Sequence, residues 1–254
     1  MNGRQRAIGA AVALDLALGE GRHRWHPVAL VGRALDLALA PWRTSGPRAQ
    51  LLGGAGAVAA VAAGSAALAW AVERGASRAG PVGWVGLAVA LKPAFALRQL
   101  LEEALAVADC LEAGRLEEAR RGLRALVSRP VAGLPPELVA SAAIESLAEN
   151  LGDSVAAPLL AFALSGLPGA AVYRVVNTAD AMFGYHGELE WLGRAAARAD
   201  DVLSWLPSRL SALALALVAG PAAGRRALRL ARLDGPSTAS PNAGRPMASA
   251  PGIK

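Results

Sequence analysis

The sequence is poor in the residues on which several protein classes depend. It contains a single cysteine, Cys110, among 254 residues, which excludes an internal disulfide framework and a zinc site built on paired cysteines. Charged residues make up only 18% of the chain, against about 25% in an ordinary soluble domain. Aromatic residues make up 4%, so few rings are available to stack on nucleic-acid bases.

The chain is instead rich in apolar residues. Apolar residues make up 54% of the chain, which excludes a disordered protein. The net charge is +6, but the basic residues are spread between apolar blocks, so we interpret them as charges flanking a membrane, with no nucleic acid as partner. Neither a phosphate-binding P-loop nor a Gly-x-Ser-x-Gly elbow is present. The composition predicts an all-α, polytopic integral membrane protein embedded in a lipid bilayer.

Four apolar segments are candidate membrane spans, near residues 49–72, 79–97, 154–173 and 202–224. The first lies between Arg48 and Glu73, and its 24 uncharged residues form about 36 Å of helix, enough to cross a hydrocarbon layer of roughly 30 Å. Gly56, Ala60 and Gly64 recur in it every four residues. Such a stripe of small residues predicts a surface on which another helix packs closely.

Two charged residues interrupt apolar segments. The span at 79–97 is long enough only if it continues through Lys92, which must then face protein or extend its amine toward the interface. Asp15 lies in the apolar stretch 7–18, which resembles the front of a secretory signal. Because of Asp15, and because no cleavage pattern follows, we expect a retained membrane-associated helix.

The third span contains residues that break helices, namely Pro158, Gly166, Pro168 and Gly169. A re-entrant or broken helix is therefore as reasonable over 154–173 as a clean crossing. Basic residues place 19–48, 92–153 and 225–254 in the cytoplasm, and four crossings would then leave 174–201 on the opposite side. A re-entrant third segment would keep 174–201 cytoplasmic, and we favour that interpretation for a multi-pass protein of the cytoplasmic membrane.

We expect one membrane-embedded domain over residues 1–235, followed by a flexible tail at 236–254. Within the domain, residues 94–150 have helical periodicity with alternating acids and bases, which predicts an amphipathic cytoplasmic helical segment. The sequence leaves the oligomeric state open.

Three carboxylates precede the third apolar segment at intervals of four residues. Glu145, Glu149 and Asp153 would line one face of a continuous helix, where they repel one another unless a cation neutralises them. Oxygen ligands suit Mg²⁺, so this pattern indicates a magnesium or substrate site. A solvated helix face at a membrane boundary is the alternative.

A second polar group follows the third apolar segment. Arg174, Asn177 and Asp180 project within two helical turns, beside the membrane. Further on, Arg194, Arg198 and Asp201 share one helical face, and Asp201, Trp205 and Arg209 share another. Ion pairs within one helix stabilise it by only ~0.3–0.5 kcal/mol each, so we expect this group of charges to serve a function.

Several longer motifs occur in a fixed order along the chain: Leu14-Asp15 with His26-Pro27-Val28; Glu145-Ser146 with Ala148-Glu149-Asn150, Asp153 and Pro158; Asn177-Thr178 with Asp180 and Gly184-Tyr185; Ala197-Arg198 with Asp200-Asp201, Pro207 and Arg209; and Ser240-Pro241-Asn242-Ala243-Gly244 with Pro246. With these motifs the chain resembles the CobD/CbiB family of cobalamin biosynthesis, the adenosylcobinamide-phosphate synthases. The family's pattern continues beyond Pro246, whereas this chain closes at Lys254, so we expect a shortened C-terminus.

The resemblance implies an enzyme that couples adenosylcobyric acid, a corrinoid, to aminopropanol phosphate through an amide bond, with ATP as co-substrate and Mg²⁺ as cofactor. We assign the residues in the motifs as follows: catalytic Glu145, Glu149, Asn177 and Asp180; substrate- and phosphate-binding His26, Arg174, Arg198 and Arg209; and Mg²⁺ ligands Glu149, Asp153 and Asp180. Two other functions stay open at this point. The intramembrane charges would also suit a membrane carrier or channel, and a shortened chain would suit an inactive scaffold of the pathway.

Overall fold

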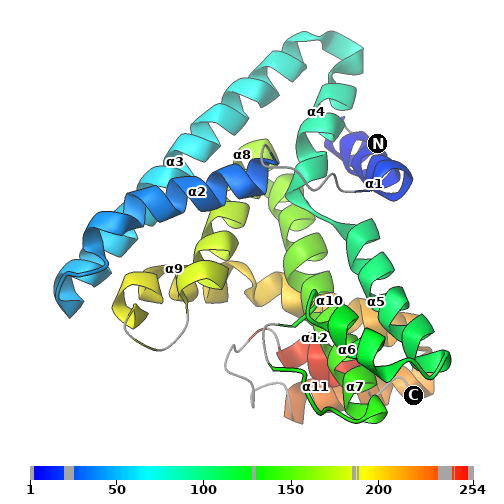
Figure 1. Cartoon of the computed structure of the whole chain (residues 1–254). Coiled ribbons are helices and arrows are strands. Elements are labelled where there is room, and N and C mark those ends of the chain that lie inside the picture. Colours follow the sequence, from blue (N-terminus) through cyan, green and yellow to red (C-terminus); the bar gives the residue numbers. More distant parts are fainter. Residues whose placement is uncertain are drawn as a thin grey trace. The chain divides into compact units, whose positions relative to one another are not determined.

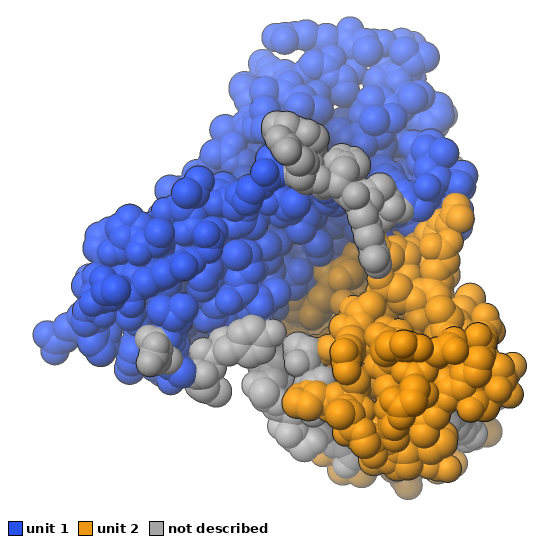
Figure 2. All heavy atoms as spheres, in the orientation of Figure 1, with its two compact units in different colours: residues 1–96, 157–203 blue, residues 97–156, 204–254 orange. Residues whose placement is uncertain are grey.

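A computed structural model describes residues 3–19, 26–127, 130–184, 187, 189–233, 242 and 244–250. Over these residues the chain forms helices and no β-strand (Figure 1), which confirms the predicted all-α class. We expected one domain over residues 1–235, and the helices divide into two compact units (Figure 2). Unit 1 comprises Met1–Ala96 and Ala157–Leu203, and unit 2 comprises Leu97–Ala156 and Ser204–Lys254.

Unit 1 contains six of the α-helices: α1 (Gly3–Leu18), α2 (Pro27–Leu39), α3 (Pro47–Arg78), α4 (Gly83–Leu91), α8 (Ala157–Phe183) and α9 (Glu190–Leu203). Three short 3₁₀ turns belong to it as well: η1 (Ala40–Trp42), η2 (Gly80–Val82) and η3 (Lys92–Ala94). Helix α2 runs beside α3, and α1 packs against α4 (Figure 1). Buried Leu35, Val175 and Leu192 belong to a core between α2, α3, α8 and α9.

Unit 2 contains α5 (Leu97–Glu112), α6 (Leu116–Leu123), α7 (Pro136–Asn150), a π-helix η4 (Leu151–Ala156), α10 (Trp205–Val218), α11 (Pro221–Leu233) and α12 (Gly244–Ser249). Val107, Leu123 and Val139 are buried where α5, α6 and α7 pack together, so residues 94–150 are largely helical, as predicted. Helix α12 lies within the segment 236–254 for which we expected a flexible tail, and it packs against α7, α10 and α11.

Among the residues that the structure describes, three helices are long and apolar enough to cross a membrane: Pro47–Arg78, Gly80–Glu112 and Pro136–Phe183. The first and third contain the predicted spans at 49–72 and 154–173, and the second covers the predicted span 79–97 from its second residue onward. A fourth span exists if the bent pair Glu190–Leu203 and Trp205–Val218 counts as one. It does not coincide with the predicted 202–224, because α10 ends at Val218, Gly220 has a positive φ of 81°, and Pro221 begins a new helix.

Among the described residues, the close approaches to α3 lie outside the stripe of small residues predicted as its packing surface. Gly56 and Gly64 are exposed, and a Cβ at either position would meet nothing within 4 Å in the described part of the chain. The close approaches occur at Gly53, beside the Trp42 ring, and at Gly54, against the backbone of Leu192. A spacing of four could not distinguish these faces, because glycine and alanine occur all around this helix.

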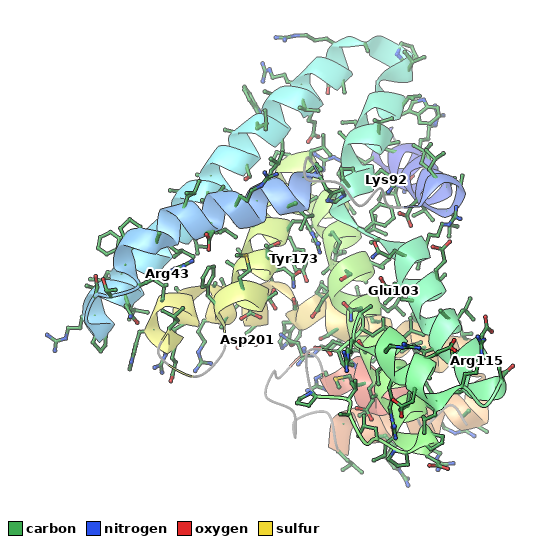
Figure 3. The ribbon with its side chains drawn as sticks, in the orientation of Figure 1. Arg43, Lys92, Glu103, Arg115, Tyr173 and Asp201 are labelled. Carbon is green, nitrogen blue, oxygen red and sulfur yellow. The ribbon has the colours of Figure 1, made fainter. Side chains whose placement is uncertain are left out.

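The two charges inside apolar segments lie together in unit 1. Lys92 Nζ is 3.5 Å from Asp15 Oδ1 and donates a hydrogen bond of 2.5 Å to the carbonyl of Gly19. The Asp15 side chain is fully buried, and Lys92 lies beside α1 (Figure 3). Of the two alternatives for Lys92, the structure shows the one in which Lys92 faces protein, where it lies beside Asp15.

Helix α8 is broken at Gly166, as the helix-breaking residues led us to expect. Gly166 has φ 73° and ψ −162°, a conformation that only glycine adopts readily, and Pro168 follows at the start of the second half. The Glu73 carboxylate accepts a 2.8 Å hydrogen bond from the Leu167 N–H and lies 3.3 Å from the Arg4 guanidinium. Arg4 in turn donates to the Leu164 carbonyl at 3.3 Å. One ion pair thus satisfies backbone groups on both sides of the break.

Candidate functional site

The second half of α8 brings polar side chains from two helices together in unit 1. Arg174 Nη1 donates to Asn177 Oδ1 at 3.4 Å, and Asn177 Nδ2 donates to Asp200 Oδ1 of α9 at 3.3 Å. Asp200 is only 7% exposed, so its carboxylate depends on such donors for solvation. These three side chains, with Asp180, Asp201 and Arg198, are called the α8–α9 cluster below.

Charge is concentrated in the α8–α9 cluster. Asp180 interacts electrostatically with both Asp200 and Asp201, and Asp201 with Arg198. Asp201 lies near the end of α9, and Tyr173 directly precedes Arg174 on α8 (Figure 3). The cluster thus combines three carboxylates with two guanidinium groups, and guanidinium groups are well suited to bind phosphate.

The local sequence explains why these side chains share one side of α8. Val175, Ala179 and Phe183 are buried in the core of unit 1, which leaves the polar residues between them on the other side of the helix. Helix α9 approaches closely because Gly193 lies against the Phe183 carbonyl, where a Cβ would overlap it. A Cβ at Gly184 would likewise overlap the Asp180 carboxylate, so only a glycine at this position leaves room for the Asp180 side chain.

The predicted acids of the other motif lie in unit 2. Glu145 and Glu149 are one turn apart on α7, and Ser141 Oγ donates to Glu145 Oε1 at 3.0 Å. Asp153 lies in the π-helix η4, and all three acids are half-buried. The π-helix η4 widens the helix just before Pro158, which lies two residues beyond its end. In a regular α-helix Pro158 would offer no N–H to the Ser154 carbonyl, and its ring would clash with that carbonyl.

A chain of hydrogen bonds supports this motif. Asn150 Nδ2 donates to the Ser146 carbonyl at 3.0 Å, and Ser154 Oγ donates to Asn150 Oδ1 at 3.2 Å. Ser146 Oγ donates to the Leu126 carbonyl. Gly152 of η4 faces Ser211 Oγ of α10 at ordinary contact distance, so the π-turn packs on α10. These hydrogen bonds stabilise the backbone of the helical turns that carry Glu149 and Asp153.

Arg209 lies in unit 2 on α10. Its guanidinium stacks 3.9 Å from the Trp205 ring, and Nη1 donates to the Trp205 carbonyl at 2.6 Å and to Asn242 Oδ1 at 3.4 Å. His26 lies in unit 1, where it precedes α2 as its N-cap residue without a capping side-chain bond. The roles predicted for both residues stay predictions.

The predicted magnesium ligands divide between the units. Glu149 and Asp153 belong to unit 2 and Asp180 to unit 1. Among the residues that the structure describes, no group of three or more histidine, cysteine or carboxylate side chains is arranged to hold a metal ion. The assignment of these three carboxylates to one Mg²⁺ therefore stays a prediction.

Sequence reasoning missed some residues of these sites. Asp200 is part of a motif but received no predicted role, yet it is the partner of Asn177. Arg232 and Arg245 line a cavity with Arg209 and were not singled out. Asp200 could have been found from its place in the motif, whereas nothing in the sequence joins Arg232 to Arg209.

Comparisons with known proteins point to a family. The model of the CobD/Cbib protein family matches residues 8–253. A cobalamin biosynthesis protein CobD from Geobacter metallireducens is 39% identical over 246 residues, which cover 95% of this chain and 77% of that protein. The protein of the same name from Stutzerimonas stutzeri is 41% identical over 251 residues, or 95% of this chain and 78% of that protein.

A third relative shares a shorter segment. A cobalamin biosynthesis protein CobD from Dehalococcoides mccartyi is 44% identical over 167 residues, which cover 65% of this chain and 54% of that protein. The chain thus matches about half the length of this relative. No solved structure matches the chain.

Proposed function

The chain belongs to the CobD/Cbib protein family, and from that premise we propose that it works in cobalamin biosynthesis as an adenosylcobinamide-phosphate synthase. The proposed reaction joins a propionate carboxylate of adenosylcobyric acid to the amine of aminopropanol phosphate. The bond formed is an amide, the co-substrate is ATP, and the product is adenosylcobinamide phosphate.

The chemistry requires activation of the acid, since a carboxylate is a poor electrophile. In the proposed first step a carboxylate oxygen attacks the γ-phosphorus of ATP, and ADP leaves. In the second step the amine nitrogen attacks the acyl carbon of the resulting acyl phosphate, inorganic phosphate leaves, and the amine gives its proton to a base. Both steps move phosphoryl charge, so a site for them needs cationic groups together with carboxylates.

The α8–α9 cluster is the observation that carries this proposal. Its hydrogen-bonded Arg174 and Asn177 adjoin buried Asp200, with Asp180 and Asp201 close by. In the proposed site Arg174 and Arg198 bind phosphoryl oxygens in the bidentate way that guanidinium allows, and Asn177 orients the substrate by donating a hydrogen bond. A carboxylate of the cluster, for which we propose Asp180, takes the proton of the amine.

The donor atoms also fit the proposed Mg²⁺. Mg²⁺ prefers oxygen ligands and keeps waters and substrate phosphates, so one or two protein carboxylates suffice. The candidate ligands lie in separate units, Glu149 with Asp153 in unit 2 and Asp180 in unit 1, and each set is proposed by itself. Glu145 is a further catalytic candidate. When bound, the ion would offset negative charge on the phosphates that these carboxylates alone would repel.

Product analysis with isotope labelling tests the reaction. Purified protein in lipid nanodiscs is incubated with adenosylcobyric acid labelled with ¹⁸O in its free carboxylate, aminopropanol phosphate, ATP and MgCl₂. We expect adenosylcobinamide phosphate and ADP in equal amounts, with one ¹⁸O atom transferred to inorganic phosphate. Product without ATP consumption, or ¹⁸O-free phosphate, would contradict the proposed activation step.

One observation favours a second candidate, a membrane carrier. Helix α8 is interrupted at Gly166 inside an apolar candidate span, with the Arg4–Glu73 ion pair at the break. Many transporters bind their substrates at such interrupted helices. Uptake of the corrinoid into proteoliposomes without amide formation would favour the carrier. The absence of both uptake and amide formation would favour a scaffold.

A further inference from the structure

A cavity of about 240 Å³ lies within unit 2. It is lined by Arg209 and Ala212 of α10, Leu228, Ala231 and Arg232 of α11, and Arg245 of α12. Half of its lining residues are arginines, one from each of three helices. The apolar residues between them hold the helices together and bring no negative charge.

The three arginines lack a carboxylate partner within the described part of the chain. Arg209 donates hydrogen bonds to neutral acceptors, the Trp205 carbonyl and the Asn242 side chain. Arg245 Nε is buried and has no hydrogen-bond partner among the described residues. Arg232 forms no ion pair with any described carboxylate.

The guanidinium groups at this cavity repel one another, and a bound anion would offset that repulsion. A guanidinium group keeps its charge at any physiological pH, so the repulsion between neighbouring groups cannot be relieved by losing a proton. Arg209 and Arg245 lie close enough for their positive charges to repel one another. Planar guanidinium groups bind phosphate through pairs of parallel hydrogen bonds, which makes phosphate a well-matched anion.

We propose that this cavity is a phosphate-binding site formed by Arg209, Arg232 and Arg245, and that its ligand is the phosphate monoester of a small molecule. The volume decides against larger ligands, since pockets for drug-sized molecules span roughly 300–1,000 Å³. In the context of the proposed function, on which this part rests, the ligand is aminopropanol phosphate. The headgroup of phosphatidic acid is a phosphate monoester of the same chemistry and the other source of such a group.

Calorimetric titration of detergent-solubilised protein with aminopropanol phosphate tests the site. We expect Arg232→Gln and Arg245→Gln each to raise the dissociation constant about tenfold or more, because a hydrogen bond between charged groups is lost. The matched control is Arg226→Gln, which removes the same charge from the exposed face of α11, and its dissociation constant should change less than twofold. If both cavity variants bind aminopropanol phosphate with the same dissociation constant as the control, the proposal is overturned.

Two further arms separate the possible explanations. If Arg245→Gln unfolds, Arg232→Gln decides, since Arg232 is exposed and its loss leaves the packing of α11 intact. In nanodiscs that contain phosphatidic acid, a raised apparent dissociation constant for aminopropanol phosphate identifies the lipid as the competing occupant of the same site.

The outcome is distinguishable from that of the proposed function. Phosphate binding that depends on the arginines, in a protein that forms no amide, supports the site and defeats the reaction. Amide formation with an unchanged KM for aminopropanol phosphate in Arg245→Gln and Arg232→Gln supports the reaction and defeats the site.

Discussion

Removing the Glu73 carboxylate should destabilise the protein far more than removing an ordinary surface acid. In the structure this side chain is 19% exposed, accepts the Leu167 N–H at the break in α8 and pairs with Arg4. Glu73→Ala takes away the acceptor at the start of the second half of α8 and leaves the Arg4 charge without its carboxylate. We expect the free energy of unfolding to fall by roughly 2–4 kcal/mol.

The magnitude follows from the contacts. A hydrogen bond to a charged acceptor contributes about 1.5–3 kcal/mol, and a negative charge at a helix N-terminus adds about 0.3–1 kcal/mol. The ion pair itself adds at most about 1 kcal/mol, because the Arg4 side chain is 39% exposed and solvent screens it. Glu73→Gln keeps an acceptor oxygen for Leu167, so its cost should be about 1 kcal/mol.

Equilibrium unfolding in mixed micelles, followed by circular dichroism, measures these differences. The matched control is Glu118→Ala, which removes a carboxylate 2.9 Å from Arg115 on the surface of unit 2 and should cost less than about 0.5 kcal/mol. If Glu73→Ala is no more destabilising than Glu118→Ala, the break in α8 is not held by this carboxylate, and the reasoning fails.

Three further predictions concern the framework of unit 1. Gly166→Ala should cost about 1–3 kcal/mol in the same assay, because φ is 73° there and a Cβ would overlap the Glu73 carboxylate; an unchanged midpoint would refute the assigned backbone. Lys92→Met should cost about 3–5 kcal/mol by leaving buried Asp15 without its ammonium, and adding Asp15→Leu should recover most of that loss; additive effects would show that the two do not act as a pair. In a Cys110→Ser background, a cysteine replacing Glu190 should react with impermeant maleimide only from the cytoplasmic side, whereas labelling from outside alone would establish a full crossing by the third span.

Much of the helical framework could be predicted because apolar length and periodicity are local properties. Runs of uncharged residues located α3, and the spacing of Arg174, Asn177 and Asp180 placed them within two turns of one helix. The break in α8 was foreseeable from Gly166 and its neighbouring prolines, since backbone limits belong to the residue itself.

What could not be predicted depends on partners far apart in the chain. Arg4 and Glu73 are separated by 69 residues, and neither belongs to a motif. The choice of Gly53 and Gly54 over Gly56 as the packing surface of α3 depends on where Trp42 and Leu192 lie. Likewise, Arg209, Arg232 and Arg245 come together at one cavity only through the packing of α10, α11 and α12.

The rate of amide formation in a single turnover tests the role of the α8–α9 cluster most directly. Wild type, Asp180→Asn and Asn177→Ala are compared, with Asp109→Asn as the control because Asp109 is exposed on α5. We predict that both cluster variants lose at least about 100-fold in rate at saturating substrates, as expected for groups that act in the reaction, while the control stays within twofold. Rates within threefold of wild type in both cluster variants would contradict the account.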